Sequence, residues 1–189
     1  MGTFGARLTE IKNGPKFVSY LEATGTQFLE LGFAPNQNTE FEITVEYDNL
    51  VGNGWFFGSG KTWANGAFYA GVIAISFGSF ARTTTHVTKG KPVVVTFKDR
   101  VLAHDGVAIV TATSNTFQAD ANAFLFGVDC TTAADELFVG RVYSFKLYDN
   151  KVLIRDMLPC YDPKGVACMF DQVEQKYYYN AGSGEFTAG

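Results

Sequence analysis

Hydrophobic and polar residues alternate along much of this chain with the period of two that is typical of β-strands. Segment 40–48 shows the pattern most clearly, since acidic side chains fall on one face and apolar side chains on the other. The apolar face consists of Phe41, Ile43, Val45 and Tyr47. In segment 141–148 one face carries Val142, Ser144, Lys146 and Tyr148, and the other carries Arg141, Tyr143, Phe145 and Leu147. Each pattern predicts an amphipathic strand with one face against a hydrophobic core.

Short breaks rich in glycine, asparagine or aspartate separate these segments. Asp105 and Gly106 stand between two apolar runs and predict a tight hairpin, because a two-residue turn needs a positive φ that glycine adopts freely. Roughly a dozen such strands lie within residues 17–189, which predicts one all-β domain, a two-sheet antiparallel sandwich. Residues 1–16 show no lasting period and are predicted to form an extended N-terminal arm.

Composition supports a folded domain and narrows its partners. Hydrophobic residues make up 47% of the chain and charged residues only 18%, so there is enough apolar material for a core. The formal net charge is −4 without a cluster of lysine or arginine, which argues against nucleic acid as a partner. The chain shows neither the apolar run of ~20 residues that spans a bilayer nor the apolar region of a signal peptide. We therefore expect assembly in the cytoplasm and no membrane partner.

The three cysteines are expected to be free thiols buried as small hydrophobic groups, since no signal peptide directs the chain to an oxidising compartment. Cys160 and Cys168 are near enough in sequence to pair, so a disulfide between them is the alternative. Cysteine and histidine spacings match no zinc motif, so no structural zinc is expected. The two histidines, His86 and His104, accompany no nucleophile motif, and we expect no catalytic triad.

Several stretches of the chain resemble a known family. They are GRVYSFKLYDN at 140–150, LIRDMLPC at 153–160, YLEATGTQF at 20–28, and FDQV, YY and NAGSGEFT within 170–187. Together they resemble the concanavalin A-like, laminin G-like domains of phage structural proteins and gut-bacterial surface proteins. The resemblance covers about residues 17–189. It implies a jelly-roll sandwich of the concanavalin A-like lectin/glucanase type.

The resemblance also implies a function in binding rather than in catalysis. Members of the family occur on phage virions or in adhesive bacterial proteins, with roles in glycan recognition or particle decoration. We therefore predict a virion surface protein, capsid-decorating or tail-associated, whose partners are other virion proteins, sister subunits and glycans. A symmetric homo-oligomer would follow from particle symmetry. The alternatives are a soluble or cell-surface carbohydrate-binding module of a bacterium and a divergent glycoside hydrolase.

Aromatic and amide side chains around the glycine-rich segment 58–60 suggest a glycan-binding surface. A flat aromatic ring beside an amide suits the apolar face of a sugar. The candidate residues are Trp55, Trp63, Phe57, Tyr69, Asn53 and Asn65. Core packing is the alternative role for the aromatic members. Tyr177 to Tyr179 form a second aromatic run, in which the middle ring must lie on the opposite face from the other two. These rings could lie at the rim of an interface or pack at a sheet edge.

Catalytic members of this superfamily carry two carboxylates on one strand in a Glu-x-Asp-x-x-Glu arrangement, because an acid and a nucleophile must flank one bond. The nearest candidates here are Glu40, Glu42, Glu46 and Asp48, whose spacing differs from that arrangement. A solvated strand face accounts for them, and we expect no catalytic activity.

Calcium is the one cofactor that the resemblance keeps open, since related domains bind it through loop carboxylates and carbonyls. The candidate ligands are Asp120, Asp129 and Asp135. No other cofactor is expected.

Overall fold

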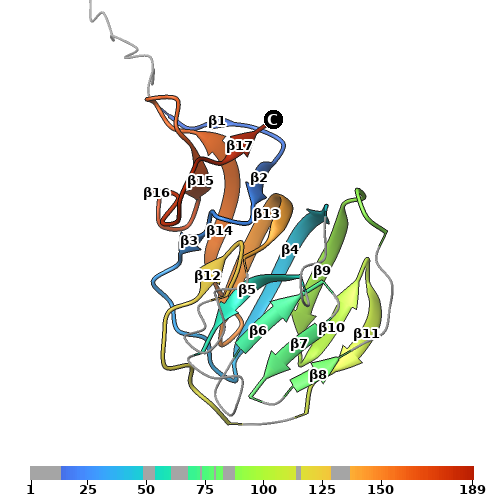
Figure 1. Cartoon of the computed structure of the whole chain (residues 1–189). Coiled ribbons are helices and arrows are strands. Elements are labelled where there is room, and N and C mark those ends of the chain that lie inside the picture. Colours follow the sequence, from blue (N-terminus) through green and yellow to red (C-terminus); the bar gives the residue numbers. More distant parts are fainter. Residues whose placement is uncertain are drawn as a thin grey trace, which may run out of the picture.

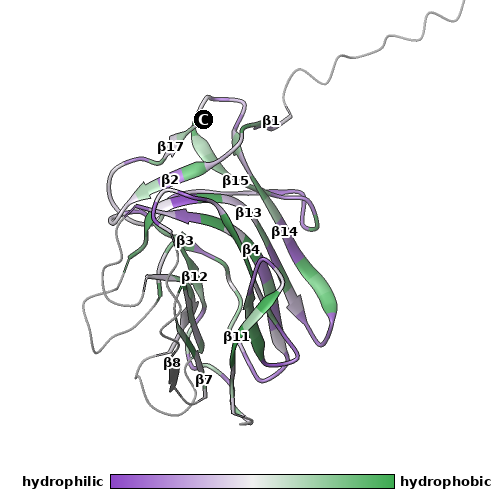
Figure 2. Ribbon diagram, turned by 90° about the vertical axis from the view of Figure 1, so that its right-hand side faces the viewer, coloured by the Kyte–Doolittle hydropathy of each residue, from purple (hydrophilic) through white to green (hydrophobic). Residues whose placement is uncertain are grey.

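The computed structural model describes residues 14–48, 54–60, 68–72, 74–78, 80–82, 88–113, 116–128 and 137–189. Within these ranges the chain consists of strands, turns and irregular segments, and none of it is a helix that could cross a membrane. The strands form two antiparallel sheets that stack face to face, as Figures 1 and 2 show. The all-β, two-sheet antiparallel jelly-roll sandwich predicted from the sequence is confirmed.

The larger sheet follows the path β11–β10–β9–β4–β13–β14–β15–β16, with β1, β2 and β17 paired alongside. Its strands are β1 (Lys16–Phe17), β2 (Leu21–Thr24), β4 (Thr39–Tyr47), β9 (Val93–Lys98), β10 (Val101–His104), β11 (Val107–Thr111), β13 (Val139–Asp149), β14 (Val152–Tyr161), β15 (Ala167–Asp171), β16 (Lys176–Tyr178) and β17 (Thr187–Ala188). Strands distant in sequence are neighbours at β9, β4 and β13, because the intervening chain crosses to the other sheet.

The smaller sheet follows the path β3–β12–β5–β6–β7–β8. Its strands are β3 (Leu29–Glu30), β5 (Trp55–Ser59), β6 (Phe68–Gly71), β7 (Ala74–Phe77), β8 (Phe80–Arg82) and β12 (Phe124–Leu125). In Figure 2 the labels β3, β12, β7 and β8 mark one layer, and β4, β13 and β14 mark the other.

Strand β4 has the burial pattern that its sequence predicts. Phe41, Ile43 and Val45 are at most 2% exposed, while Glu40 and Glu42 between them are only half-buried. Because successive side chains of a strand point to opposite faces, the alternation turns one face of β4 towards the smaller sheet. Strand β9 repeats the pattern, with alternate residues buried.

Phenylalanine rings from both sheets fill the space between them. Phe41 and Phe97 of the larger sheet stack with centroids 6.0 Å apart. Phe57 of the smaller sheet lies 5.2 Å from Phe145, and Phe68 lies 5.7 Å from Phe97. Each fully buried ring of this kind contributes about 1.5–3 kcal/mol relative to an exposed one. Most phenylalanine residues of the chain therefore lie in one hydrophobic core.

The hairpin predicted at Asp105 and Gly106 is present between β10 and β11. Both residues have positive φ, 47° and 80° respectively. The Asp105 carboxylate also accepts a hydrogen bond from the backbone N–H of Val94 at 3.0 Å, which fastens the turn to β9.

The two ends of the described chain lie side by side at one end of the sandwich (Figure 1). Lys16 and Phe17 pair with the end of β14, so the chain is already part of the sheet at Lys16. The backbone N–H groups of Ser19 and Tyr20 donate to the carbonyl of Gly189 at 2.7 and 2.9 Å. Most of the predicted N-terminal arm, residues 1–13, lies outside the described residues.

Candidate functional site

Three of the aromatic residues predicted to form a glycan-binding surface are buried. Trp55, Phe57 and Tyr69 are 1%, 0% and 0% exposed. Phe57 belongs to the main core, whereas Trp55 and Tyr69 pack with centroids 5.7 Å apart in a separate cluster on the other side of the smaller sheet. These rings therefore have the packing role that the sequence left open, and they offer no face to a sugar. Asn53, Trp63 and Asn65 lie outside the described residues.

Only one of the three calcium candidates lies in the part of the chain that the structure describes. Asp120 is exposed, while Asp129 and Asp135 lie outside the described residues. Among the described side chains, no three of histidine, cysteine, aspartate or glutamate come together to hold a metal ion.

Two carboxylates of β4, Glu42 and Glu46, are engaged with β13 on the outer face of the larger sheet. Glu42 lies 3.7 Å from Lys146. Glu46 accepts hydrogen bonds from Arg141 at 3.0 Å and from the hydroxyl of Tyr143 at 2.6 Å. The sequence predicted a solvated face for these carboxylates. This prediction is wrong for Glu46, which is only 7% exposed because these two partners cover it.

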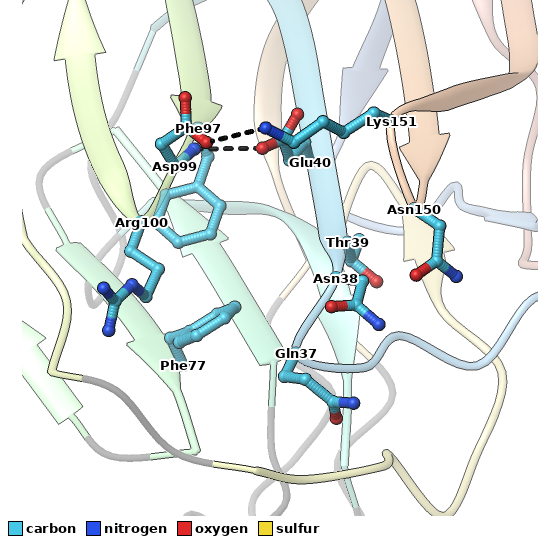
Figure 3. A pocket seen from close by; sticks show the side chains of 10 residues that line it. All are labelled: Gln37, Asn38, Thr39, Glu40, Phe77, Phe97, Asp99, Arg100, Asn150 and Lys151. Atoms are coloured by element: carbon cyan, nitrogen blue, oxygen red, sulfur yellow. Dashed lines mark hydrogen bonds and ion pairs between the residues drawn. The ribbon is translucent and has the colours of Figure 1, made fainter.

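Two hairpin turns and the start of β4 enclose a cavity of about 330 Å³, which we call the turn pocket (Figure 3). It lies where β9 turns into β10 and β13 turns into β14. Its lining residues are Gln37, Asn38, Thr39, Glu40, Phe77, Phe97, Asp99, Arg100, Asn150 and Lys151. Figure 3 shows the polar side chains around the rings of Phe77 and Phe97.

The backbone of both turns adopts the left-handed conformation without glycine. Asp99 and Arg100 have φ of 48° and 66°, and Asn150 and Lys151 have φ of 49° and 65°. The hairpin at Asp105 places a glycine at its second position, which is the usual solution. A residue with a Cβ atom costs about 1–2 kcal/mol in this conformation, and aspartate and asparagine adopt it more readily than other residues because their short side chains hydrogen-bond locally. Arg100 and Lys151 therefore occupy unfavourable positions, and both side chains line the turn pocket.

Polar contacts hold the rim of the turn pocket together. The Nζ atom of Lys151 lies 3.2 Å from Oδ1 of Asp99, so the two turns are joined. The backbone N–H of Asp99 donates to Oε1 of Glu40 at 3.0 Å. The backbone N–H of Asn150 donates to the carbonyl of Asn38 at 3.2 Å. Three separate segments of the chain are thereby connected around one opening.

Other polar groups at the same rim have no partner within the described part of the chain. The guanidinium of Arg100 and the side-chain amide of Asn38 make no hydrogen bond or ion pair there. Phe77 and Phe97 close the floor, with ring centroids 5.1 Å apart and 1% of each side chain exposed. The pocket thus combines an apolar floor with a few unengaged polar groups, which is the usual make-up of a small-molecule site.

A second hollow of about 370 Å³ adjoins the turn pocket on the outer face of the larger sheet. It shares Glu40, Phe97, Asp99 and Lys151 with the turn pocket and extends to Glu42 and Tyr148. A ligand longer than one ring could therefore continue from the first hollow into the second.

A cavity at the opposite end of the sandwich has a volume of about 500 Å³, and we call it the terminal pocket. It lies between the β14–β15 hairpin and the C-terminal segment. Its lining residues are Tyr161, Gly165, Val166, Ala167, Tyr179, Asn180, Gly182, Gly184, Glu185, Phe186, Thr187 and Ala188. Tyr179 is 45% exposed there, while Tyr178 is 6% exposed on the other face, as the strand period predicts.

Sequence reasoning identified neither pocket. The residues of the turn pocket come from segments about 110 residues apart, and each segment by itself has the composition of an ordinary turn. The one local signal is the absence of glycine at the second position of two short hairpins, and it is visible only once the strands on either side are known.

Comparisons with known proteins support the β-sandwich fold but do not assign the chain to a family. No family model matches this chain, and no curated protein matches its sequence. Among solved structures, a similar one is described as a putative carbohydrate binding protein from Bacteroides ovatus ATCC 8483, with a TM-score of 0.63 and 9% identity. The match covers 92% of this chain and 60% of that chain. At this identity the likeness shows a shared β-sandwich, and membership of the concanavalin A-like, laminin G-like family stays a prediction.

Proposed function

We propose that this chain is a non-catalytic carbohydrate-binding module whose ligand occupies the turn pocket. The observation that carries the proposal is the placement of Arg100 and Lys151 at left-handed turn positions beside the same cavity. Backbone strain of this kind persists where the side chain has a function that glycine would remove.

The chemistry of the rim suits a ligand rich in hydroxyl groups. A guanidinium offers several N–H donors in one plane, and an amide offers a donor and an acceptor side by side. Arg100 and Asn38 hold these groups free of other partners in the described structure, while Glu40 and Asp99 add acceptor oxygens. Neighbouring hydroxyls of a sugar ring present the matching pattern of donors and acceptors.

Two further findings support a binding role. The B. ovatus protein with a similar sandwich is described as a putative carbohydrate binding protein. Two of the carboxylates nearest to a catalytic set, Glu42 and Glu46, face the outside of the larger sheet and are engaged with Lys146, Arg141 and Tyr143. Catalysis by a carboxylate pair needs both groups free to flank a glycosidic bond.

The location on a phage virion remains part of the proposal through the sequence resemblance alone. Light scattering on the purified chain tests the accompanying prediction of a homo-oligomer.

Binding is tested by probing the purified full chain on an array of bacterial glycans, with and without calcium. We expect saturable binding to at least one glycan. The variants Arg100→Ala and Asn38→Ala should each weaken it by about tenfold, the loss of one good hydrogen-bonding group in a partly closed site. Lys89→Ala serves as the charge-matched control, since Lys89 is exposed and does not line the turn pocket.

Two outcomes would contradict the proposal. Absence of saturable binding to every glycan would remove carbohydrate recognition as the function. Binding that is unchanged in both pocket variants would place the ligand elsewhere on the molecule. Cleavage of a polysaccharide that is lost on Glu42→Gln or Glu46→Gln would instead establish the hydrolase alternative.

A further inference from the structure

We infer that the terminal pocket is a second, separate ligand site, which takes an uncharged pyranose ring stacked on Tyr179. This inference does not depend on the turn pocket. Among the described residues, the two cavities share no lining residue. Strand β14 runs from Val152, beside the turn pocket, to Tyr161 in the terminal pocket, which separates the two by roughly 30 Å.

The ring of Tyr179 is exposed and at the same time fixed in place. Its hydroxyl donates a hydrogen bond to Oδ2 of Asp162 at 2.9 Å. Its ring packs on Tyr177 with centroids 6.2 Å apart and an interplanar angle of 28°. A ring that is already ordered before binding avoids a cost of about 0.5–1.5 kcal/mol for immobilising a side chain. The ring of Tyr179 is therefore held in position before any ligand binds.

Asp162 has the properties that keep this hydrogen bond in place. It is 7% exposed and accepts backbone N–H groups from Val166 and Lys164, each at 2.8 Å. These hydrogen bonds, the one from Val166 above all, lower the pKa of Asp162, so that the carboxylate is ionised at neutral pH. Burial, together with the hydrogen bond to Asp162, raises the pKa of Tyr179 to about 12, so that its hydroxyl stays protonated and donates.

Tyr179 ends a row of aromatic rings that crosses three strands. Phe17 of β1 contacts Phe170 of β15 with centroids 6.2 Å apart. Phe170 contacts Tyr177 of β16 at 5.0 Å, and Tyr177 contacts Tyr179. The rings at the two ends are 47% and 45% exposed, whereas Phe170 between them is 8% exposed. The interior rings thus support the exposed ring at the pocket.

The polar lining of the terminal pocket indicates the class of ligand. None of its lining residues in the described structure is lysine or arginine. The carboxylate of Glu185 has no partner in the described part of the chain, so it is free to accept hydrogen bonds from hydroxyl groups. With Asp162 ionised nearby, an anionic sugar would be repelled. An uncharged pyranose suits this pocket. Its apolar face can stack on Tyr179, and the hydroxyl groups at its edge can donate to Glu185.

The test uses the full chain and four uncharged hexasaccharides, built from glucose, mannose, galactose or xylose, in calorimetric titrations. The informative variants are Tyr179→Phe and Tyr179→Leu. Both lose the hydrogen bond to Asp162, so any structural effect of that loss is common to the pair. Only the first retains an aromatic face. Urea unfolding of each variant checks that the domain remains folded.

We expect at least one hexasaccharide to bind the native chain, Tyr179→Phe to weaken binding by about threefold, and Tyr179→Leu by a further factor of about ten. Glu185→Gln should weaken it, because an amide offers one acceptor oxygen where the carboxylate offers two. Equal affinities for the two Tyr179 variants, or no binding of any hexasaccharide to the native chain, would overturn the inference. Binding lost in Arg100→Ala but kept in Tyr179→Leu would overturn it and support the turn pocket alone.

Discussion

Gly140 of β13 lies so close to β4 that a Cβ atom at this position would overlap with the backbone carbonyl oxygen of Glu46. Its φ of +147° is also one that residues with a Cβ atom rarely adopt. Gly58 stands in the same relation to the carbonyl oxygen of Phe68 across β5 and β6. Two strand pairings, one in each sheet, therefore depend on the absence of a side chain.

We predict that Gly140→Ala lowers the free energy of unfolding by about 3 kcal/mol, because the backbones of β13 and β4 must separate to admit the methyl group. Gly106→Ala is the matched control, since it has a positive φ but nothing within 4 Å of the added Cβ atom. It should cost only about 1 kcal/mol. Urea unfolding curves measure both, and equal losses would show that conformation rather than close packing determines the effect.

The turns of the turn pocket should become more stable when their function is removed. We expect Arg100→Gly and Lys151→Gly each to raise the free energy of unfolding by about 0.5–1 kcal/mol, as relief of left-handed strain exceeds the entropy cost of glycine. The ion pair of Lys151 with Asp99 detracts little, because its side chains are 73% and 64% exposed. Unfolding curves of the two variants test this, and a loss of stability would mean that the side chains serve the fold.

The thiols of Cys160 and Cys168 should react only when the domain unfolds. The two residues are directly opposite in the pairing of β14 with β15, with Sγ atoms 3.6 Å apart and both side chains 0% exposed. Both are free thiols, as expected from the sequence. The hydrogen bond with Cys160, together with burial, raises the pKa of Cys168.

The measurement is modification by a disulfide reagent in a Cys130→Ser background, with and without urea. We expect the native rate to be roughly 100-fold lower than the denatured rate, because the attacking thiolate is inaccessible in the folded domain. Comparable rates under the two conditions would show that the β14–β15 hairpin opens locally. Cys130 itself lies outside the described residues.

Stability should fall as the pH is lowered through the titration of His104. This side chain is 9% exposed, and its Nε2 atom has no hydrogen-bond partner within the described structure. Burial lowers the pKa of His104, an effect that Asp105 and a backbone hydrogen bond with Val72 oppose in part. The unfolded chain takes up a proton at His104 near the ordinary pKa of about 6.5, whereas the folded chain takes it up only at lower pH. The free energy of unfolding therefore falls as the pH drops below about 6.5.

Urea unfolding at pH 7.5 and pH 5.5 tests this expectation. The native chain should be less stable at the lower pH, and His104→Gln should reduce the difference. His86→Gln, which removes the other histidine of the chain, serves as the comparison. The same slope in all three proteins would show that other groups cause it.

Local sequence was sufficient for the strands and for one hairpin. The alternation at 40–48 predicted the burial of Phe41, Ile43, Val45 and Tyr47, because the period of two is a property of the strand itself. Asp105 and Gly106 predicted their turn for the same reason, since the required backbone angles are local to the two residues. Alternation at Tyr177 to Tyr179 likewise predicted opposite faces for neighbouring rings.

The two pockets and the burial of Trp55 and Tyr69 were decided by the tertiary structure. Alternation states which face of a strand is apolar, but it does not state whether the other face is also covered, as it is along β5 and β6. The turn pocket exists because the order β9–β4–β13 brings the turn at Asp99 beside the turn at Asn150. Strand order results from the packing of the whole core, so no local stretch of sequence encodes it.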